Sequence, residues 1–456
     1  MLFCEIKFDL FEARILVDVL LVAPPYKGMT REPVGLYYLA SVLLKNKVSV
    51  KVLDLNLNKM RLRDFQEYVR KSDPRVVGVT SYSFNYYLCE DVLKAVKNVR
   101  PEIVAVLGGV HASSMPEVVL STNAYVDYLV VGEGEYTFLE LCQRLLGGQS
   151  CDDVQGIAYN MSGVRVNPSR KPIDDLNTLN IPDRETLGYQ KYSVALVQTS
   201  RGCPYSCIFC NICNQYGRTI RFRDPKIVVD ECEALVRKYN YKQIYFFGDS
   251  FTFDKQWVDC FCDEILSRRL KFRWSCETRV DNVDLKILTK MKNAGCHMVQ
   301  YGIDYGDEDV LKKLGKSFSL AAVEEACEWA KKSKLGIEAF FIFNCPGENS
   351  ETMNNTYNLI QRLPLDALEI NLLTPYPGTQ IWRKPEAYGL KIINKDYWNY
   401  TTKKYVLENE SFPREKFVPA FWDLLKRMNL VTADHSQPEI FAFLETEKKI
   451  AAWSSD

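Results

Sequence analysis

Four cysteines lie close together near the middle of the chain, in the segment "TSRGCPYSCIFCNIC". They are Cys203, Cys207, Cys210 and Cys213, and they fall within eleven consecutive positions. Thiols at this density can form disulfides, bind zinc, hold an iron–sulfur cluster or pack in an ordinary core. Composition and spacing distinguish between these alternatives.

The composition argues against a framework of disulfides. The chain has 456 residues, an odd number of cysteines (15), and 58 acidic against 58 basic residues. No apolar run is long enough to span a bilayer, and the N-terminus "MLFCEIKFDLFEAR" is acidic where a signal peptide is basic. We therefore expect a cytoplasmic protein, in a compartment that keeps thiols reduced. The zero net charge gives no indication of a broad nucleic-acid-binding face.

The spacing of the cysteines favours a cluster over zinc. A structural zinc site usually takes two ligands from each of two arms, which eleven residues supply only awkwardly. The pattern Cys203-x3-Cys207-x2-Cys210 suits a loop wrapped around a 4Fe–4S cube, in which three thiolates hold three irons. The fourth iron is then open to a ligand that is not a cysteine. Cys213 could fill that position, or it could be a small buried residue.

Alternating apolar and amphipathic stretches surround this segment in the second half of the chain. Six strands are predicted, at residues 192–200, 242–249, 272–278, 296–304, 336–344 and 367–375. Helical stretches such as "PKIVVDECEALVRKY" lie between them. Six βα units in sequence indicate a full or partial βα barrel, whose active site lies at the C-terminal ends of its strands. The cysteines directly follow the first strand and so belong to that face.

The first 150 residues alternate in the same way and predict a doubly wound, five-stranded parallel sheet covered on both faces. Its strands are expected at residues 17–24, 48–55, 75–81, 102–109 and 125–135. The fold class is therefore α/β. We expect a Rossmann-like domain at 15–150, a hairpin and linker at 151–190, a barrel at 191–385 and a mainly helical segment at 386–456.

The cysteine segment closely resembles the cluster motif of the radical SAM superfamily, where an aromatic residue such as Phe209 is common before the last cysteine. The resemblance extends over the whole barrel. It implies that Cys203, Cys207 and Cys210 hold the cluster and that Cys213 does not. In that superfamily the open iron chelates S-adenosylmethionine, and one electron from the cluster cleaves it to a 5′-deoxyadenosyl radical.

Later strand ends resemble segments that hold S-adenosylmethionine in the same superfamily. "FFGDSF" stands where the family often has Gly-Gly-Glu, so a shorter carboxylate replaces the glutamate. "YGIDYG" resembles "GIESGS", and "FIFNCPGE" and "LLTPYPGT" resemble the segments that frame adenine. Besides Phe209, the expected cofactor contacts in the barrel are Gly248, Asp249, Ser250, Glu277, Arg279 and Asp304.

The first domain resembles the cobalamin-binding domain that precedes the barrel in class B radical SAM methyltransferases. "LGGVHAS" and "VVGEGE" carry this resemblance. Many cobalamin domains ligate cobalt through Asp-x-His-x-x-Gly, which this chain lacks, as that radical SAM class commonly does. A vestigial domain without a cofactor is the alternative. The expected cobalamin contacts are Ser81, Gly108, Gly109, His111, Gly132 and Glu133, with His111 on the corrin or its tail and not on cobalt.

These resemblances imply a cobalamin-dependent radical SAM enzyme that methylates an unactivated carbon of a small-molecule or lipid-like substrate. Cyclisation or rearrangement without methyl transfer is an alternative within the same class. The partners expected are the substrate and a one-electron donor such as flavodoxin or ferredoxin, with no nucleic acid and no transmembrane segment. A non-catalytic cofactor sensor is disfavoured by the intact set of cofactor-like strand ends.

A tRNA methylthiotransferase would also place a flavodoxin-like domain before the barrel, but it needs a second cluster on three cysteines of that domain. Here Cys4, Cys89 and Cys142 are poorly placed for one, because Cys4 precedes the first strand and Cys142 lies in the last helix. A short basic group follows the cluster segment, and it is expected to be a solvated face: Arg218, Arg221 and Arg223.

Overall fold

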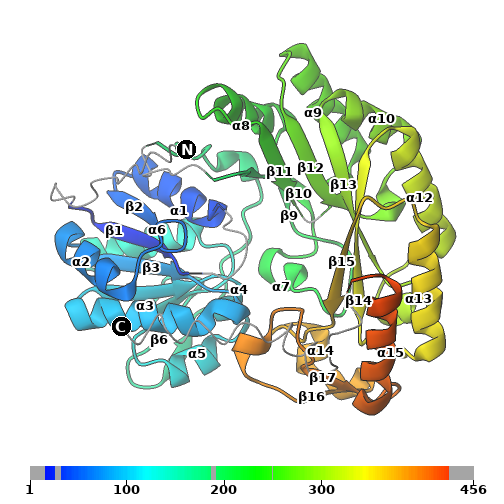
Figure 1. Cartoon of the computed structure of the whole chain (residues 1–456). Coiled ribbons are helices and arrows are strands. Elements are labelled where there is room, and N and C mark those ends of the chain that lie inside the picture. The colour runs from blue at the N-terminus through cyan, green and yellow to red at the C-terminus, as the bar shows by residue number, and fades with distance from the viewer. Residues whose placement is uncertain (1–15, 26–31, 186–191, 249, 431–456) are drawn as a thin grey trace, which may run out of the picture.

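The computed structural model describes residues 16–25, 32–185, 192–248 and 250–430. Two α/β bodies lie side by side, and a short helix, α7 (Ile212–Tyr216), lies between them (Figure 1). No helix within the described ranges combines the length and the apolar character needed to cross a membrane.

The first domain is built on a sheet of seven strands, ordered β2-β1-β3-β4-β5-β6-β7. Five are parallel and match the five predicted strands: β1 (Val19–Ala23), β2 (Val50–Asp54), β3 (Val76–Thr80), β4 (Val104–Gly108) and β5 (Tyr128–Val130). The predicted hairpin supplies β6 (Ile157–Asn160) and β7 (Val164–Val166), of which β6 pairs antiparallel with β5. The hairpin therefore extends the first sheet.

Helices cover both faces of this sheet, because successive residues of each strand point to opposite sides. Leu20 and Val22 of β1 face one core, whereas Val19 and Leu21 face the other. The first core is closed by α2 (Leu62–Ser72), α3 (Tyr86–Val99), α4 (Val110–Ser114) and α5 (Pro116–Thr122). The second is closed by α1 (Val34–Lys45) and α6 (Glu135–Leu146). The doubly wound domain is thus confirmed.

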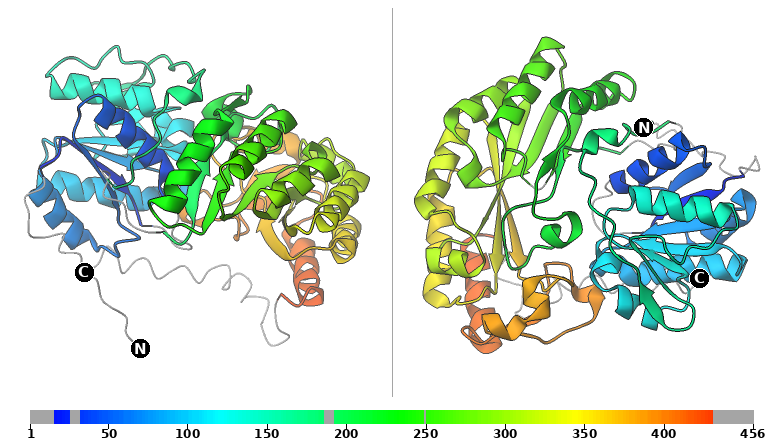
Figure 2. Two further views of the ribbon diagram at one scale, coloured as in Figure 1. Left: turned by 90° about the horizontal axis from the view of Figure 1, so that it is seen from above. Right: turned by 180° about the vertical axis from the view of Figure 1, so that it is seen from behind.

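The second domain has an open, fully parallel sheet of six strands, ordered β15-β14-β13-β12-β11-β8. All six predicted strands are present: β8 (Ala195–Gln198), β11 (Gln243–Phe247), β12 (Arg273–Thr278), β13 (Cys296–Asp304), β14 (Gly336–Phe343) and β15 (Ala367–Leu372). The strands form an arc and not a closed ring, so the barrel is partial (Figure 2).

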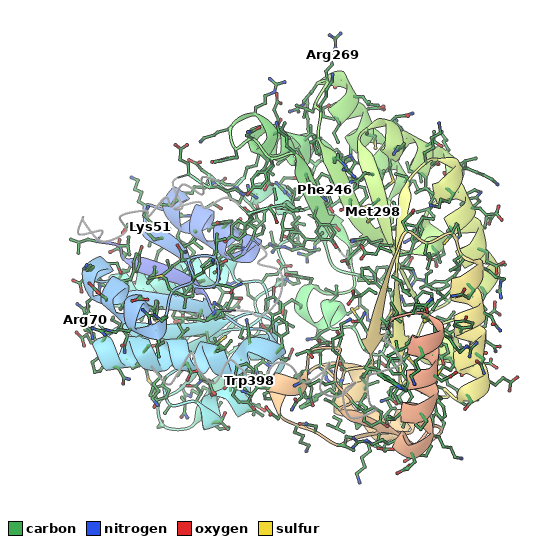
Figure 3. All side chains as sticks on the ribbon, viewed as in Figure 1. Lys51, Arg70, Phe246, Arg269, Met298 and Trp398 are labelled. Carbon is green, nitrogen blue, oxygen red and sulfur yellow. The ribbon has the colours of Figure 1, made fainter. Side chains whose placement is uncertain are left out.

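Six helices cover the outer side of this arc (Figures 1 and 2). They are α8 (Pro225–Arg237), α9 (Lys255–Ser267), α10 (Leu285–Asn293), α11 (Glu308–Lys313), α12 (Leu320–Lys332) and α13 (Ser350–Arg362). Phe246 and Trp274 point into the core beneath these helices, and Figure 3 labels Phe246 on its strand. Tyr245 and Glu277 are an odd number of residues from Phe246 and Trp274 on the same strands, so they face the opposite, concave side.

The C-terminal region contains the predicted helix, α15 (Arg414–Arg427), together with α14 (Gln380–Arg383). It also forms a small antiparallel ladder that the sequence did not predict, between β16 (Leu390–Ile392) and β17 (Leu407–Asn409). The region reaches the first domain through a tilted aromatic pair, Tyr87 and Trp398, whose ring centroids are 5.6 Å apart. Figure 3 labels Trp398.

A buried ionic network joins the two domains and their linker. Arg184 of the linker pairs with Glu32, which precedes α1, and with Glu231 of α8 at 3.3 Å. Arg223 pairs with the other oxygen of Glu231 at 2.8 Å. All four side chains are at most 2% exposed. Arg223 therefore does not lie on a solvated face, contrary to the prediction, because two buried carboxylates need two buried cations.

Candidate active site between the two domains

The cysteines lie in one closed loop, residues 202–220, which we call the cluster loop. Two short strands close it, β9 (Ser200–Arg201) and β10 (Arg221–Phe222), paired antiparallel with Arg201 opposite Arg221. Gly202 has a φ of 93°, and a Cβ there would lie 2.2 Å from the carbonyl oxygen of Thr219. Only glycine fits this closure, because the loop's two ends approach each other so tightly.

None of the loop's four cysteines is in a disulfide, and all four are partly exposed. The Cys213 thiol lies 3.1 Å from the carbonyl oxygens of both Cys203 and Tyr205, to which it can donate. Cys213 thus supports the loop backbone, which leaves Cys203, Cys207 and Cys210 as the candidate thiolates. The described residues hold no group of three or more Cys, His, Asp or Glu suited to a single metal ion.

Two predicted contact residues brace the cluster loop from the barrel. The Arg279 guanidinium lies 3.6 Å from the ring centre of Tyr205, and it forms a two-point ion pair with Asp281. The Tyr205 hydroxyl donates to Asn282 at 3.0 Å, and Asn282 donates to the Ser250 hydroxyl at 3.0 Å. Ser250 and Arg279 therefore lie beside the loop, with polar groups engaged in supporting it.

Asp304 is ion-paired with a residue that sequence reasoning missed. Its carboxylate lies 2.6 Å from the Lys316 ammonium, and both side chains are under a tenth exposed. Burial raises the pKa of Cys207, and the positive charges of Lys316 and Arg279 oppose that rise. Gly315 packs directly on the loop, since a Cβ there would lie 2.6 Å from the carbonyl oxygen of Ser206. A lysine after a glycine is too common a pattern to have identified Lys316.

The end of β11 packs closely on two polar side chains beside the loop. A Cβ on Gly248 would lie 2.6 Å from the Thr199 hydroxyl and 2.7 Å from the Ser200 hydroxyl. Both hydroxyls are buried and have no hydrogen-bond partner among the described residues. Unpartnered buried hydroxyls next to an obligatory glycine fit the polar end of S-adenosylmethionine. Asp249 lies outside the described residues.

The concave face of the barrel carries a row of polar side chains. The Tyr245 hydroxyl donates to Glu277, and the Gln300 amide donates to Glu338. Glu277, Gln300 and Glu338 stand at paired positions of three neighbouring strands, so they form one line across the sheet. Phe209, in contrast, packs against the apolar barrel core, so its ring supports the loop from behind.

The loops after β3 and β4 are tied together at the carboxyl edge of the first sheet. The Ser81 hydroxyl is buried and donates to the carbonyl oxygen of Gly108 at 2.7 Å. Gly109 has a φ of 93°, and a Cβ there would lie 2.5 Å from the carbonyl oxygen of Ser81. Gly108 has space for a Cβ, whose nearest neighbour would be Val130 at 3.8 Å. These residues form closely packed loops at the carboxyl ends of the strands, which is where doubly wound folds bind ligands.

His111 is buried between the first domain and the C-terminal region. Its Nδ1 lies 3.0 Å from the Ser83 hydroxyl, and its ring packs on Tyr86 and Tyr397 at 4.4 and 4.6 Å. Burial lowers its pKa to about 4, so the imidazole is neutral at pH 7. Its Nε2 has no partner among the described residues. Contact with the corrin or its tail remains a prediction.

The "VVGEGE" loop contacts the cluster loop directly. The carbonyl oxygen of Gly132 accepts a hydrogen bond from Gln215 at 3.1 Å. The Glu133 carboxylate is paired with Arg221 at 2.5 Å and accepts from the backbone N–H of Ile173 at 2.8 Å. Arg221 is only 10% exposed, so the prediction of a solvated face is wrong for it, whereas Arg218 is exposed as expected. Arg221 was misjudged because its partner lies 88 residues away.

Comparisons with known proteins agree with this geometry. Residues 28–142 match the model of the B12 binding domain, and residues 197–360 match that of the radical SAM superfamily. The chain is 31% identical over 413 residues to an uncharacterized methyltransferase, PH0819, of Pyrococcus horikoshii, covering 88% of this chain and 90% of that protein. The chain therefore belongs to the radical SAM enzymes that carry a B12-binding domain, and its cofactors are a 4Fe–4S cluster, S-adenosylmethionine and cobalamin.

Two further relatives bear on the reaction and the fold. The anaerobic magnesium-protoporphyrin IX monomethyl ester cyclase of Rubrivivax gelatinosus is 29% identical over 87% of this chain and 74% of that protein. The radical S-adenosylmethionine methyltransferase TsrM from Kitasatospora setae, solved with cobalamin and a [4Fe-4S] cluster bound, superposes with a TM-score of 0.76 at 18% identity. That superposition covers 97% of each chain, and it shows a shared fold.

Proposed function

We propose that this enzyme transfers a methyl group from S-adenosylmethionine to an unactivated carbon of a polar small molecule. The observation that carries the proposal is the direct contact between the loops assigned to the two cofactors. Gln215 of the cluster loop bonds Gly132, and Asn211 donates to the Ser114 hydroxyl at 2.7 Å. Loops in such contact hold their cofactors near each other, as two cofactors that act on one substrate require.

The chemistry divides between the cofactors and the chain. When bound, the cluster supplies the electron that cleaves S-adenosylmethionine to a carbon radical, and cobalamin supplies a route for the methyl group. The chain's own residues bind and orient the cofactors. Three thiolates, of Cys203, Cys207 and Cys210, hold the cluster. The unpartnered hydroxyls of Thr199 and Ser200, beside Gly248, bind the polar end of S-adenosylmethionine.

The concave face of the barrel supports a polar substrate over a lipid-like one. Glu277 and Glu338 each already accept one hydrogen bond, from Tyr245 and Gln300, and each retains further acceptor capacity. An apolar substrate placed over these carboxylates would remove their water without replacing its hydrogen bonds, which is costly. A substrate that carries hydroxyl or amine groups would replace them. The two glutamates therefore favour the small-molecule alternative.

Cyclisation without methyl transfer is the second candidate, because the Rubrivivax relative is a cyclase. The methyltransferase reaction is preferred for two reasons. The Pyrococcus relative is described as a methyltransferase. TsrM from Kitasatospora setae, also solved with its tryptophan substrate, is likewise a methyltransferase that acts on a polar small molecule. A one-electron donor such as flavodoxin or ferredoxin and a cytoplasmic location complete the proposal.

The experiment uses S-adenosylmethionine with a deuterated methyl group and anaerobically reconstituted protein. A small-molecule extract is separated into polar and lipid fractions, and each is searched by mass spectrometry for compounds that gain the label. We expect labelled products from the polar fraction only, and none when Cys203, Cys207 and Cys210 are all replaced by Ala. Label confined to the lipid fraction would contradict the polar substrate. Altered compounds without any label would favour cyclisation.

A further inference from the structure

The cluster loop is held at both of its ends by the cobalamin-binding domain. Its closing ladder places Arg201 opposite Arg221, and the two guanidiniums reach the first residue of α6 and the loop that precedes it. There Glu135 pairs with Arg201 at 2.5 Å, and Glu133 pairs with Arg221 at 2.5 Å. Glu133 also lies 3.7 Å from Arg201, which links the two pairs.

These ion pairs are buried and balanced in charge. All four side chains are between 4% and 10% exposed, and two carboxylates balance two guanidiniums. The Gln198 side chain accepts from Arg201 at 2.9 Å, and Arg201 also stacks on Tyr216 of the cluster loop at 5.5 Å. Buried pairs with this many partners are geometrically fixed, because any displacement leaves a charge unpaired in a poorly solvated site.

We propose that Glu133 and Glu135 are positioning residues, which fix the cluster loop against the cobalamin-binding domain and so set the separation of the two cofactors. Glu133 then acts on the cluster through Arg221 and not as a cofactor contact. The cluster loop is braced on its other side by Tyr205 and Arg279 of the barrel. Its shape thus depends on both domains at once, whichever reaction the cofactors then perform.

The ion pairs of Glu133 and Glu135 differ from the other buried ion pairs of the domain junction in their position relative to the cysteines. The network of Glu32, Arg184, Glu231 and Arg223 joins the linker and α8, and only Arg223, ten residues after Cys213, is near the cysteines in sequence. Arg201, in contrast, is two residues from Cys203, and Glu133 and Glu135 flank Gly134 where a loop predicted to face cobalamin enters α6. Weakening the Glu133 and Glu135 pairs should therefore loosen residues 202–220 more than it loosens the rest of the barrel.

The test is hydrogen–deuterium exchange on the full-length protein without cofactors, comparing Glu135→Gln with Glu140→Gln. Glu140 lies on the same helix as Glu135 and pairs with Arg144 and Arg170, but these contacts do not involve the cluster loop. We expect exchange across residues 202–220 to accelerate by about tenfold or more in Glu135→Gln and to stay unchanged in Glu140→Gln. After reconstitution, iron should also pass faster to a chelator from Glu135→Gln.

Unchanged exchange across residues 202–220 in a folded Glu135→Gln protein would overturn the proposal. Equal acceleration throughout the barrel strands would overturn it as well, since that outcome indicates a general structural role. If Glu135→Gln does not fold, Glu133→Gln is compared with Glu140→Gln under the same criteria. The new glutamine side chain can still accept the hydrogen bond from the backbone N–H of Ile173, which favours folding of this variant. The measurement involves no turnover. Failure to find a methylated product would therefore contradict the proposed reaction without affecting the exchange result.

Discussion

Cys213 illustrates how a thiol can serve a cluster site without being a ligand. Its sulfur contacts two carbonyl oxygens of the cluster loop, and those bonds are weak because a thiol is a poor donor. We expect Cys213→Ala to retain about four irons per chain and to keep forming 5′-deoxyadenosine, whereas joint replacement of Cys203, Cys207 and Cys210 by Ala removes both. Iron analysis and chromatography measure the two outcomes. Loss of the cluster in Cys213→Ala would show that Cys213 is a ligand.

His111 provides a prediction for the pH dependence of stability. Its pKa is lowered to about 4 in the folded state by burial, against about 6.5 when unfolded. The unfolded chain therefore binds a proton more readily than the folded protein does. The contribution of the neutral His111 side chain to the free energy of unfolding is fully present above pH 6.5 and is lost as the pH falls toward 4. Between pH 7.5 and pH 5, this residue should lower the free energy of unfolding by about 2 kcal/mol.

Urea denaturation of the cofactor-free protein and of His111→Phe, at both pH values, measures this effect. Phe preserves the ring that packs on Tyr86 and Tyr397 but cannot be protonated. The variant should gain about 2 kcal/mol relative to the unmodified protein on going from pH 7.5 to pH 5. An equal difference at both pH values would mean that His111 does not titrate in this range.

At the scale of a single loop, the two glycines at the end of β4 are not equivalent, although the sequence predicted a cobalamin contact for both. A Cβ at Gly109 would collide with the backbone of Ser81 and would force an L-residue to a φ of 93°. A Cβ at Gly108 would make only ordinary contacts. We expect Gly109→Ala to lose cobalamin while keeping the cluster, and Gly108→Ala to bind both.

Absorption spectra after reconstitution with hydroxocobalamin, together with iron analysis, separate these outcomes. Normal cobalamin binding by Gly109→Ala would mean that this loop does not shape the cobalamin site. If both variants lost cobalamin, a direct role for the Gly108 backbone would be indicated instead of the steric argument.

Sequence reasoning predicted the elements well where a local pattern defines them, and poorly where distant partners do. The six barrel strands alternate with helical stretches along the sequence, and all six are present in one parallel sheet. The β16–β17 ladder was missed because its strands have three residues each and depend on long-range pairing. The pairing of β6 with β5 was not predicted for the same reason.

The candidate site divides in the same way. The three candidate cysteines, Gly109 and Gly248 could be predicted from local sequence patterns, whereas the tight positions of Gly202 and Gly315 were missed. The partners of Glu133, Asp304 and Arg221 could not, because ion pairing depends on which surfaces the two domains bring together. Several predicted cofactor contacts, among them Ser81 and Arg279, prove to have polar groups that hold neighbouring loops in place.

On the scale of the whole molecule, each domain contributes loops to one junction. The carboxyl edge of the first sheet and the C-terminal ends of the barrel strands meet around the cluster loop and α7 (Figure 1). Ligands bind at these edges in doubly wound sheets and in βα barrels. Their meeting brings the loops assigned to the two cofactors to one junction.

The most direct test of this account is the fate of S-adenosylmethionine during turnover with a polar substrate fraction. The reaction is run anaerobically with the deuterated methyl label, with and without cobalamin. We predict that both S-adenosylhomocysteine and 5′-deoxyadenosine form, that labelled methyl appears in the product, and that omitting cobalamin abolishes S-adenosylhomocysteine and the label. Formation of 5′-deoxyadenosine and an altered substrate, with neither S-adenosylhomocysteine nor labelled product, would contradict methyl transfer.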